Sequence, residues 1–355
     1  MIQASYKPHT LNFKTPGGTS RGVLKTKDTY FLILNTKDKL GIGECALFRG
    51  LSADDRPDYE EKLKWVCQNI NLGLERLLLE LREYPSIQFG LETAFKSLGS
   101  ENQFDLFPSK FSRGEDSILI NGLIWMGDKA FMKQQIKEKI AAGFSCIKMK
   151  IGAIDFQTEM ALIKSIRKEF SSKDIELRVD ANGAFLPENA LEKLKILSDF
   201  DLHSIEQPIK QGQIEQMAAL CKITPLPIAL DEELIGVFSL ENKQELLKAI
   251  KPQYIILKPS LVGGFKGTDE WIAIAENHSI GWWITSALES NVGLNAIAQY
   301  TYNKQNTMPQ GLGTGSLFTN NIDCPLQVKN GALQYNKKEL WDLRNFNNQN
   351  ITECI

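Results

Sequence analysis

The chain has 355 residues, of which 43% are hydrophobic, so it is long enough to build two or three domains with cores of their own. Its 41 lysines and arginines against 43 aspartates and glutamates leave a net charge of −2. A charge so close to zero excludes the basic field that nucleic acid or an anionic membrane requires, and we expect a small-molecule partner instead.

The six cysteines and three histidines are scattered along the chain, with no Cys-x-x-Cys pair. This pattern argues against both a zinc site and a disulfide framework, and most of the cysteines are expected in the core. The first residues lack the charged head and apolar run of a signal peptide, and no apolar stretch reaches the length of a membrane span. A cytoplasmic protein is therefore expected, and the sequence leaves its oligomeric state open.

Residues 1–112 are expected to form an α+β domain, because strand-like and helix-like segments occur here without regular alternation. Two glycine-containing stretches have the composition of loops. The expected elements are, in chain order, a loop at 15–22, strands at 29–34 and 40–45, a loop at 48–52, and helices at 59–81 and 91–98.

Residues 113–324 repeat a different pattern, in which a short apolar strand is followed by a polar turn and an amphipathic helix. Eight such units predict a closed parallel (β/α) barrel with its helices outside. A doubly wound sheet also alternates, but it needs fewer strands and usually a glycine-rich first turn, which this sequence lacks. The barrel strands are expected to end near Asn121, Lys150, Asp180, Glu206, Asp231, Lys258, Ser286 and Gly311.

The last part of the chain, residues 325–355, no longer alternates. Residues 326–328 and 332–335 flank Asn330-Gly331, which is a strong signal for a β-hairpin. We expect this segment to return to the N-terminal domain. A solvated tail is the alternative for the last dozen residues, which are rich in asparagine.

Lysines stand on opposite sides of the expected barrel mouth, where the chemistry of such barrels lies. Lys148 and Lys150 share one face of the second strand, because side chains alternate along a strand. Lys258 ends the sixth strand, four places away in a ring of eight. Taken alone, Lys148 and Lys150 are explained more simply by an edge strand whose lysine-bearing face is exposed to solvent.

Carboxylates end three neighbouring strands of the same mouth, at Asp180, Glu206 and Asp231. Three clustered carboxylates cannot all stay ionised without a cation, and oxygen ligands suit Mg²⁺ first and Mn²⁺ second. Each residue alone could instead cap a helix or mark the end of a strand. Capping explains one carboxylate at a time, whereas a metal site explains all three.

A metal beside a lysine pair indicates removal of a proton next to a carboxylate. Lys150 can serve as the base only if its pKa falls from about 10.4 towards roughly 7 to 8. Lys148, on the same face, supplies the like charge that disfavours protonation of Lys150. A Schiff-base lysine is the alternative, but that chemistry does not need three carboxylates.

Together these residues resemble the muconate-lactonising subgroup of the enolase superfamily, and the resemblance covers nearly the whole chain. It implies that the three carboxylates bind Mg²⁺, that Lys150 is the general base, and that Lys258 is the lysine opposite. The motifs that carry it are Lys148-Met-Lys150, Val179-Asp-Ala-Asn-Gly183, Ile205-Glu-Gln-Pro208, Leu230-Asp-Glu232 and Leu257-Lys-Pro259.

The resemblance also implies that residues 1–112 cap the barrel, with loops near Arg21 and at 48–51 closing over the substrate. The last two strand ends, 285–291 and 311–318, resemble those of the o-succinylbenzoate synthases, dehydratases of menaquinone biosynthesis. The chain departs from that family at Gly313, where these synthases often carry Asp. Backbone amides and small side chains can cradle a carboxylate and arginine can neutralise it, so the expected substrate-binding residues are Arg178, Ser286, Ser290, Gly311 and Arg21.

Two other functions compete with the dehydratase. A racemase of N-acylamino acids or an epimerase of dipeptides would use Lys150 and Lys258 equally well, one on each face of the α-carbon. Dipeptide epimerases, however, usually carry Asp-x-Asp at the eighth strand, and residues 311–315 contain no carboxylate. A catalytically inactive ligand-binding barrel is the other competing function. Such a protein would be expected to lose the ionisable residues of the mouth first, and all six are present here.

Overall fold

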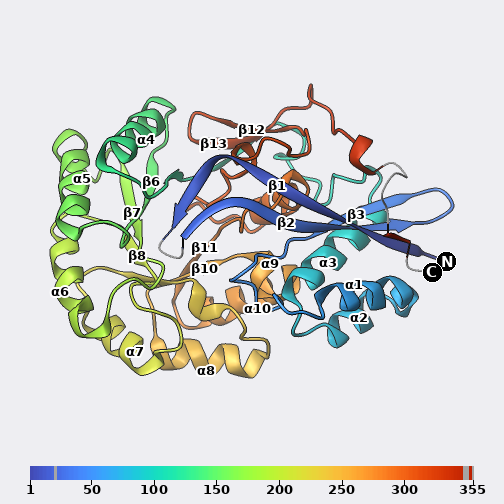
Figure 1. Ribbon diagram of the computed structural model, residues 1–355, viewed down its shortest axis with the longest axis horizontal. Coiled ribbons are helices and arrows are strands. Elements are labelled where there is room, and N and C mark those ends of the chain that lie inside the picture. Colours follow the sequence, from blue (N-terminus) through green and yellow to red (C-terminus); the bar gives the residue numbers. More distant parts are fainter. Residues whose placement is uncertain (20–21, 347–351, 354–355) are drawn as a thin grey trace.

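The computed structural model describes residues 1–19, 22–346 and 352–353, and it contains two large sheets of different kinds (Figure 1). A four-stranded antiparallel sheet, in the order β14-β1-β2-β3, is built from both ends of the chain. A seven-stranded parallel sheet runs through the middle of the chain in the order β11-β10-β9-β8-β7-β6-β5. The fold is thus a (β/α) barrel with an α+β domain at its mouth.

The α+β domain packs a helix closely against its sheet. Gly43 on β3 and Gly90 on α3 lie opposite each other, and a Cβ on Gly43 would collide with the backbone of α3. Glycine at this contact therefore allows the close approach. The elements are β1 (Gln3–Thr19), β2 (Gly22–Asn35), β3 (Leu40–Cys45), α1 (Tyr59–Gln68), η1 (Ile70–Leu72), α2 (Leu74–Glu80), α3 (Pro85–Gly99) and β14 (Thr352–Glu353).

Two of the expected elements in this domain were wrong. The single helix at 59–81 is broken into α1 and α2 by η1 and by Gly73, whose φ of +84° cannot continue a helix. Residues 15–19, expected in a loop, continue β1 and pair with β2 through Gly17 and Gly18. The helix expected at 91–98 begins earlier, at Pro85.

Helices surround the barrel on its outside, as Figure 1 shows for α4 to α8. The barrel strands are β5 (Gly122–Ile124), β6 (Cys146–Lys150), β7 (Glu176–Asp180), β8 (Ser204–Glu206), β9 (Ile228–Leu230), β10 (Tyr254–Leu257) and β11 (Gly281–Ile284). The helices are α4 (Lys129–Ala141), α5 (Phe156–Glu169), α6 (Pro187–Ser198), α7 (Ile214–Ile223), α8 (Leu240–Ile250), α9 (Pro259–Val262), α10 (Gly264–Asn277) and α11 (Asn291–Asn303), with short turns η2 (Glu232–Leu234), η3 (Gly315–Leu317) and η4 (Arg344–Phe346).

Gln310 and Gly311 close the barrel in place of an eighth regular strand. Gln310 forms a parallel bridge to Ile120, and Gly311 forms one to Thr285 at the end of β11. The side chain of Gln310 completes the join, because its Oε1 accepts a hydrogen bond of 2.8 Å from the backbone N–H of Ile284. A glutamine side chain thus adds to the backbone hydrogen bonds that join the seam.

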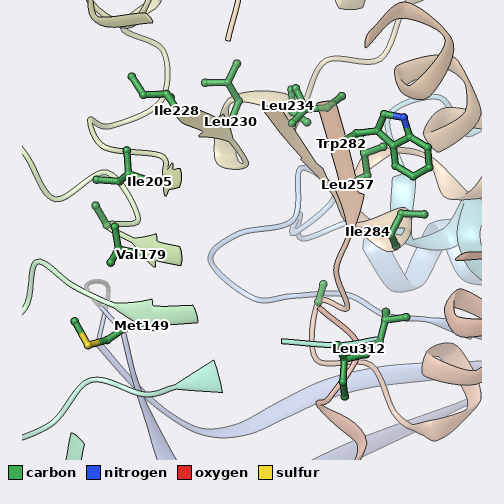
Figure 2. Packing of buried hydrophobic residues seen from close by; sticks show 14 of the residues in the cluster. Met149, Val179, Ile205, Ile228, Leu230, Leu234, Leu257, Trp282, Ile284 and Leu312 are labelled. Carbon is green, nitrogen blue, oxygen red and sulfur yellow. The ribbon is translucent and has the colours of Figure 1, made fainter. Parts of the chain in front are cut away.

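Two apolar layers support the strands. Between strands and helices lies the main core, whose side chains Figure 2 shows spaced round the ring from Met149 through Leu257 to Leu312. Inside the barrel a smaller cluster of Ala229, Ile256 and Trp283 fills the bottom. Because neighbouring residues alternate faces, the lysines on either side of Met149 point inward, above this cluster.

The C-terminal segment divides between the two domains. The expected hairpin forms as β12 (Leu326–Lys329) and β13 (Ala332–Tyr335), but it pairs with β4 (Ser117–Leu119) beside the barrel rather than with the N-terminal domain. β14 returns to that domain, where Thr352 pairs with Tyr6 of β1, and Phe346 packs against Phe31 of β2. None of the helices in the described part of the chain combines the length and apolar character needed to cross a bilayer.

Glu92 of α3 joins the N-terminal domain to the barrel. Its carboxylate accepts hydrogen bonds from the backbone N–H groups of Phe265 and Lys266, at the start of α10. Burial raises the pKa of Glu92 to about 7, and the two backbone donors only partly offset this effect. Between pH 4.5 and about 7, the Glu92 carboxyl is therefore protonated in the native state. In the unfolded chain, where its pKa has the ordinary value of 4.5, it has already lost this proton.

We expect this proton to make the stability of the wild type fall as the pH rises from 4.5 to about 7. Glu92→Gln removes the titrating group, so the free energy of unfolding of wild type minus variant should fall by roughly 3 kcal/mol across that window. Denaturant titrations of both proteins at several pH values measure the difference. A difference that stays constant or grows with pH would contradict the role of Glu92.

Candidate active site

Five ionisable residues, on β6 to β8 and directly after β9, meet at the carboxyl end of the barrel, and all are nearly inaccessible to solvent. Cα registers align Lys150 with Asp180, and Asp180 with Glu206, so adjacent strands deliver their charges to one level. The exposed fractions are 7% for Lys148, 9% for Lys150, 0% for Asp180, 2% for Glu206 and 2% for Asp231. Charges this deeply buried must be matched by other charges.

The lysines and carboxylates pair across neighbouring strands. Lys150 Nζ donates to Asp180 Oδ2 at 2.9 Å, and Lys148 Nζ lies 2.9 Å from the same oxygen and also contacts Glu206. On the other side of the mouth, Lys258 pairs with Asp231. The structure therefore brings together all six residues that the sequence indicated as catalytic or metal-binding.

The charges of this cluster shift the pKa values of several of its members. Burial alone would lower the pKa of Lys148, but the surrounding carboxylates, Asp180 first, raise it above its usual range. Burial raises the pKa of Asp180, yet Lys148 and Lys150 outweigh it and hold this pKa well below its usual range. For Glu206, burial and the nearby Asp180 raise the pKa well above normal. Of the carboxylates, Glu206 is the one whose negative charge is least compensated.

The carboxylates fit a hard divalent cation in their chemistry. All three present oxygen only, and Glu206 Oε1 is buried without a hydrogen-bond partner. Within residues 1–19, 22–346 and 352–353, no three His, Cys, Asp or Glu side chains stand together as a ready metal centre. Lysine nitrogens contact all three carboxylates instead, so a divalent ion would have to displace Lys148 and Lys258 from them.

Polar residues next to the ligand positions hold this arrangement, and the sequence reasoning missed their roles. Asn182, at a φ of +45°, accepts a 2.7 Å hydrogen bond from Lys150 Nζ and donates one of 3.0 Å to Glu232. Gln207 accepts from the backbone N–H of Asp231 at 3.2 Å. Their positions in the motifs, two residues after Asp180 and directly after Glu206, were the available signal.

A cavity of about 520 Å³ opens over these residues. Lys148, Lys150 and Lys258 line its floor together with Asp180, so both sides of the mouth reach the same space. The N-terminal domain supplies part of the roof, through Lys14, Thr15, Pro16, Leu24, Phe48 and Leu51. A ligand of this volume would lie between the opposed lysines.

Two residues expected to bind substrate lie elsewhere. Arg178 is 1% exposed and is absent from the cavity wall, because it points down the barrel to Glu176 Oε1 at 2.6 Å and over the ring of Trp283 at 4.2 Å. Ser290 is buried away from the cavity and caps α11, bound to Glu44. These two expectations are therefore corrected. Arg21 lies outside the described residues.

The other two expected substrate-binding residues do lie on the cavity wall. Ser286 and Gly311 line it from the seventh and eighth strand ends, joined by Gly313 and Thr314. The backbone N–H of Ser286 is already bonded to the carbonyl oxygen of Gly311 at 3.0 Å. Its hydroxyl faces Thr314 Oγ1 at 2.7 Å, so both polar groups of Ser286 have partners within the protein.

Comparison with known proteins finds relatives over most of the chain. A model of the Enolase C-terminal domain-like family matches residues 131–339. The o-succinylbenzoate synthase of Desulfotalea psychrophila is 48% identical over 94% of this chain and 98% of its own length. The crystal structure of MenC from Desulfotalea psychrophila LSv54 superposes with a TM-score of 0.84 at 44% identity, over 94% of this chain and 99% of that one. The L-Ala-D/L-Glu epimerase of Bacillus subtilis is more distant, at 27% identity over 58% of this chain and 54% of its own length.

Proposed function

Because the chain belongs to the Enolase C-terminal domain-like family and is an enzyme of the enolase superfamily, we propose that it is an o-succinylbenzoate synthase. Its reaction would be the dehydration of 2-succinyl-6-hydroxy-2,4-cyclohexadiene-1-carboxylate to 2-succinylbenzoate in menaquinone biosynthesis. The observation that carries this proposal is the pair of opposed lysines in one cavity beside three buried carboxylates, in a chain 48% identical to a synthase of that name.

We propose Mg²⁺ as the cofactor, held by Asp180, Glu206 and Asp231, with Mn²⁺ as a substitute. When bound, it would supply positive charge that stabilises negative charge developing on the substrate carboxylate. The buried, unpartnered oxygen of Glu206 supports this assignment. The lysine contacts would then open, so the lysines would turn from the carboxylates towards the substrate.

Lys150 is the proposed general base. Its Nζ takes the proton from the carbon next to the carboxylate, and then returns a proton to the departing hydroxyl, which leaves as water while the ring becomes aromatic. Asn182 supports this role because it accepts a hydrogen bond from Lys150 Nζ and so fixes the position of the nitrogen. Lys258, from the far side of the mouth, remains protonated and stabilises the negative charge of the dienolate.

We also propose that residues 1–112 act as a cap over a catalytic barrel of residues 113–324, with 325–355 contributing to both, in a cytoplasmic enzyme. The function of the cap would be to exclude water, which would otherwise quench the dienolate. Support comes from Thr15 and Phe48 of the first domain, which line the cavity.

If the cap closes, backbone amides at 15–18 and 48–52 should exchange hydrogen more slowly when ligand binds. The measurement is hydrogen–deuterium exchange of the protein with Mg²⁺ alone and with Mg²⁺ plus 2-succinylbenzoate. Helix α7, on the outside of the barrel, serves as the internal control and should not change. Equal exchange at the two cap segments in both samples would refute closure.

The decisive test of the function is direct assay of the cyclohexadiene substrate with purified protein, with Mg²⁺ and with EDTA. We expect metal-dependent formation of 2-succinylbenzoate. N-acylamino acids and dipeptides in D₂O provide the second arm, since a racemase or epimerase would incorporate deuterium at the α-carbon. Exchange without dehydration would replace the proposed function by that alternative, although the Gly311–Gly315 segment offers no carboxylate for a substrate ammonium group.

A further inference from the structure

Glu289, in the loop between β11 and α11, is a fully buried carboxylate that does not line the cavity. Its Oε1 accepts a hydrogen bond of 2.5 Å from Ser260 Oγ. Its Oε2 accepts bonds of 2.7 Å from both Ser286 Oγ and the backbone N–H of Ala287. A carboxylate with this many donors pointed at it holds the segments that carry those donors in one arrangement.

These donors come from α9 and from the segment after β11, which form one side of the active site. Ser260 lies two residues after Lys258, whose own backbone begins the short helix α9. Ser286 and Ala287 form the cavity wall at the seventh strand end. Through Ser286, Glu289 also reaches Thr314, so that one carboxylate connects the ends of the sixth, seventh and eighth strands.

The direction of the hydrogen bonds is fixed by this carboxylate. Ser286 has one hydroxyl proton and donates it to Glu289, while its oxygen accepts from the backbone N–H of Leu288 at 3.1 Å. Thr314 must then use its own proton for Ser286 Oγ, 2.7 Å away. Neither hydroxyl keeps a proton for the substrate, so both act by shaping the wall.

We propose that Glu289 is a positioning residue, which holds Lys258 and the wall of Ser286 and Thr314 in the geometry that the reaction needs. It touches neither the substrate nor the carboxylates proposed to bind metal. The proposal rests on the proposed function for the identity of the reaction. Its consequence is that loss of Glu289 should lower the rate of the chemical step more than it weakens substrate binding.

Glu44 of β3 offers a matched control. It is equally buried, and it accepts hydrogen bonds from Thr29 Oγ1, Ser290 N and Gly293 N, all at 2.8–2.9 Å. Both carboxylates act on the buried Lys27, whose Nζ has no hydrogen-bond partner among the described residues. Glu44 therefore shares the burial and the neighbouring cation of Glu289, but it holds α11 rather than the loop of Lys258.

The test compares Glu289→Gln with Glu44→Gln by steady-state kinetics of the dehydration at saturating Mg²⁺. A glutamine at 289 can still accept from Ser260 or from Ser286 and Ala287, but not from both sides. We expect kcat to fall about 10- to 100-fold in Glu289→Gln, with KM and the Mg²⁺ concentration for half-maximal activity within about threefold of wild type. Glu44→Gln should lower the melting temperature but keep kcat within about threefold.

Equal effects of the two variants on kcat, or a change confined to melting temperature, would reduce Glu289 to a structural role and overturn the proposal. If Glu289→Gln does not fold, Ser260→Ala cuts only the link between Glu289 and the Lys258 loop. It should lower kcat about tenfold at unchanged KM. Wild-type kcat in Ser260→Ala would overturn the proposal by itself.

A second measurement keeps this inference separate from the proposed function. If wild-type protein does not dehydrate the cyclohexadiene, the function fails, and crystal structures of the same variants without substrate then decide about Glu289. In Glu289→Gln, Ser286 and Thr314 should lose their contact and Lys258 should leave Asp231. In Glu44→Gln both contacts should persist. An unaltered wall and Lys258 in Glu289→Gln would overturn the positioning role.

Discussion

Replacing Lys150 by alanine should abolish both dehydration and exchange of the substrate's α-proton, with a fall in rate of at least about 10⁴-fold. In the proposed mechanism this one nitrogen removes the proton and then protonates the leaving hydroxyl, so no step bypasses it. Lys150→Arg should be equally inactive, because a guanidinium does not give up its proton at neutral pH. Single-turnover kinetics with saturating Mg²⁺ measure both variants.

Lys258→Arg is the matched comparison, because Lys258 is expected to act by its positive charge. Arginine keeps that charge but changes its shape, so measurable dehydration should remain, at a rate reduced by about 10²- to 10³-fold. If Lys150→Ala dehydrates at a near-normal rate, or if Lys150→Arg is as active as Lys258→Arg, then Lys150 is not the base.

Glu206→Gln should weaken Mg²⁺ binding by more than about 100-fold and stop turnover, while the protein stays folded. Losing even an outer hydrogen-bond partner of a metal ligand costs about 10- to 100-fold in affinity, and here a proposed ligand itself loses its charge. Glutamine has nearly the same shape as glutamate, and removing one of three crowded negative charges relieves their repulsion in the metal-free state.

Isothermal titration calorimetry with MgCl₂ measures the affinity, and circular dichroism with thermal unfolding in EDTA measures the fold. We expect a melting temperature in EDTA no lower than that of wild type. Glu232→Gln is a useful comparison, because Glu232 lies beside the site, where its Oε1 accepts a hydrogen bond from Asn182, but it is not one of the three proposed ligands, so the variant should retain most of the Mg²⁺ affinity. Unchanged affinity in Glu206→Gln would remove Glu206 from the metal site.

The barrel and the residues of its mouth could be predicted from the sequence because both depend on short-range patterns. Strand–helix alternation sets the fold, and a residue at a strand end is delivered to the mouth whatever the details of packing. Lys148, Lys150, Asp180, Glu206 and Asp231 therefore meet as expected. The family membership inferred from the same motifs is confirmed by the match over residues 131–339.

Alternation does not predict how far along the barrel a long side chain reaches, and this is why Arg178 was wrongly expected at the cavity wall. Arg178 shares the inward face of β7 with Asp180, so alternation alone places both inside the barrel. One lies at the mouth and the other lies lower down, where Glu176 and Trp283 pair with it. Long flexible side chains reach partners that only the three-dimensional structure brings near.

Contacts between residues distant in sequence could not be predicted either. Ser290 was expected in the substrate-binding wall, but its hydroxyl donates a hydrogen bond to Glu44, which is 246 positions earlier in the chain. The hairpin at Asn330-Gly331 was predicted from its own turn residues, whereas its pairing with β4 depends on barrel closure. Local signals predict an element, and only the assembled chain determines what it packs against.

The antiparallel sheet of the N-terminal domain contains strands from both ends of the chain, and this affects how the protein folds during synthesis. Phe31 and Ile33 of β2 leave the ribosome early, yet they pack with Val292, Ile322 and Phe346, which are made last. This apolar face must therefore stay uncovered while the whole barrel is translated. We expect the nascent chain to need a chaperone over that interval, and the cap to be the last part of the molecule to become native.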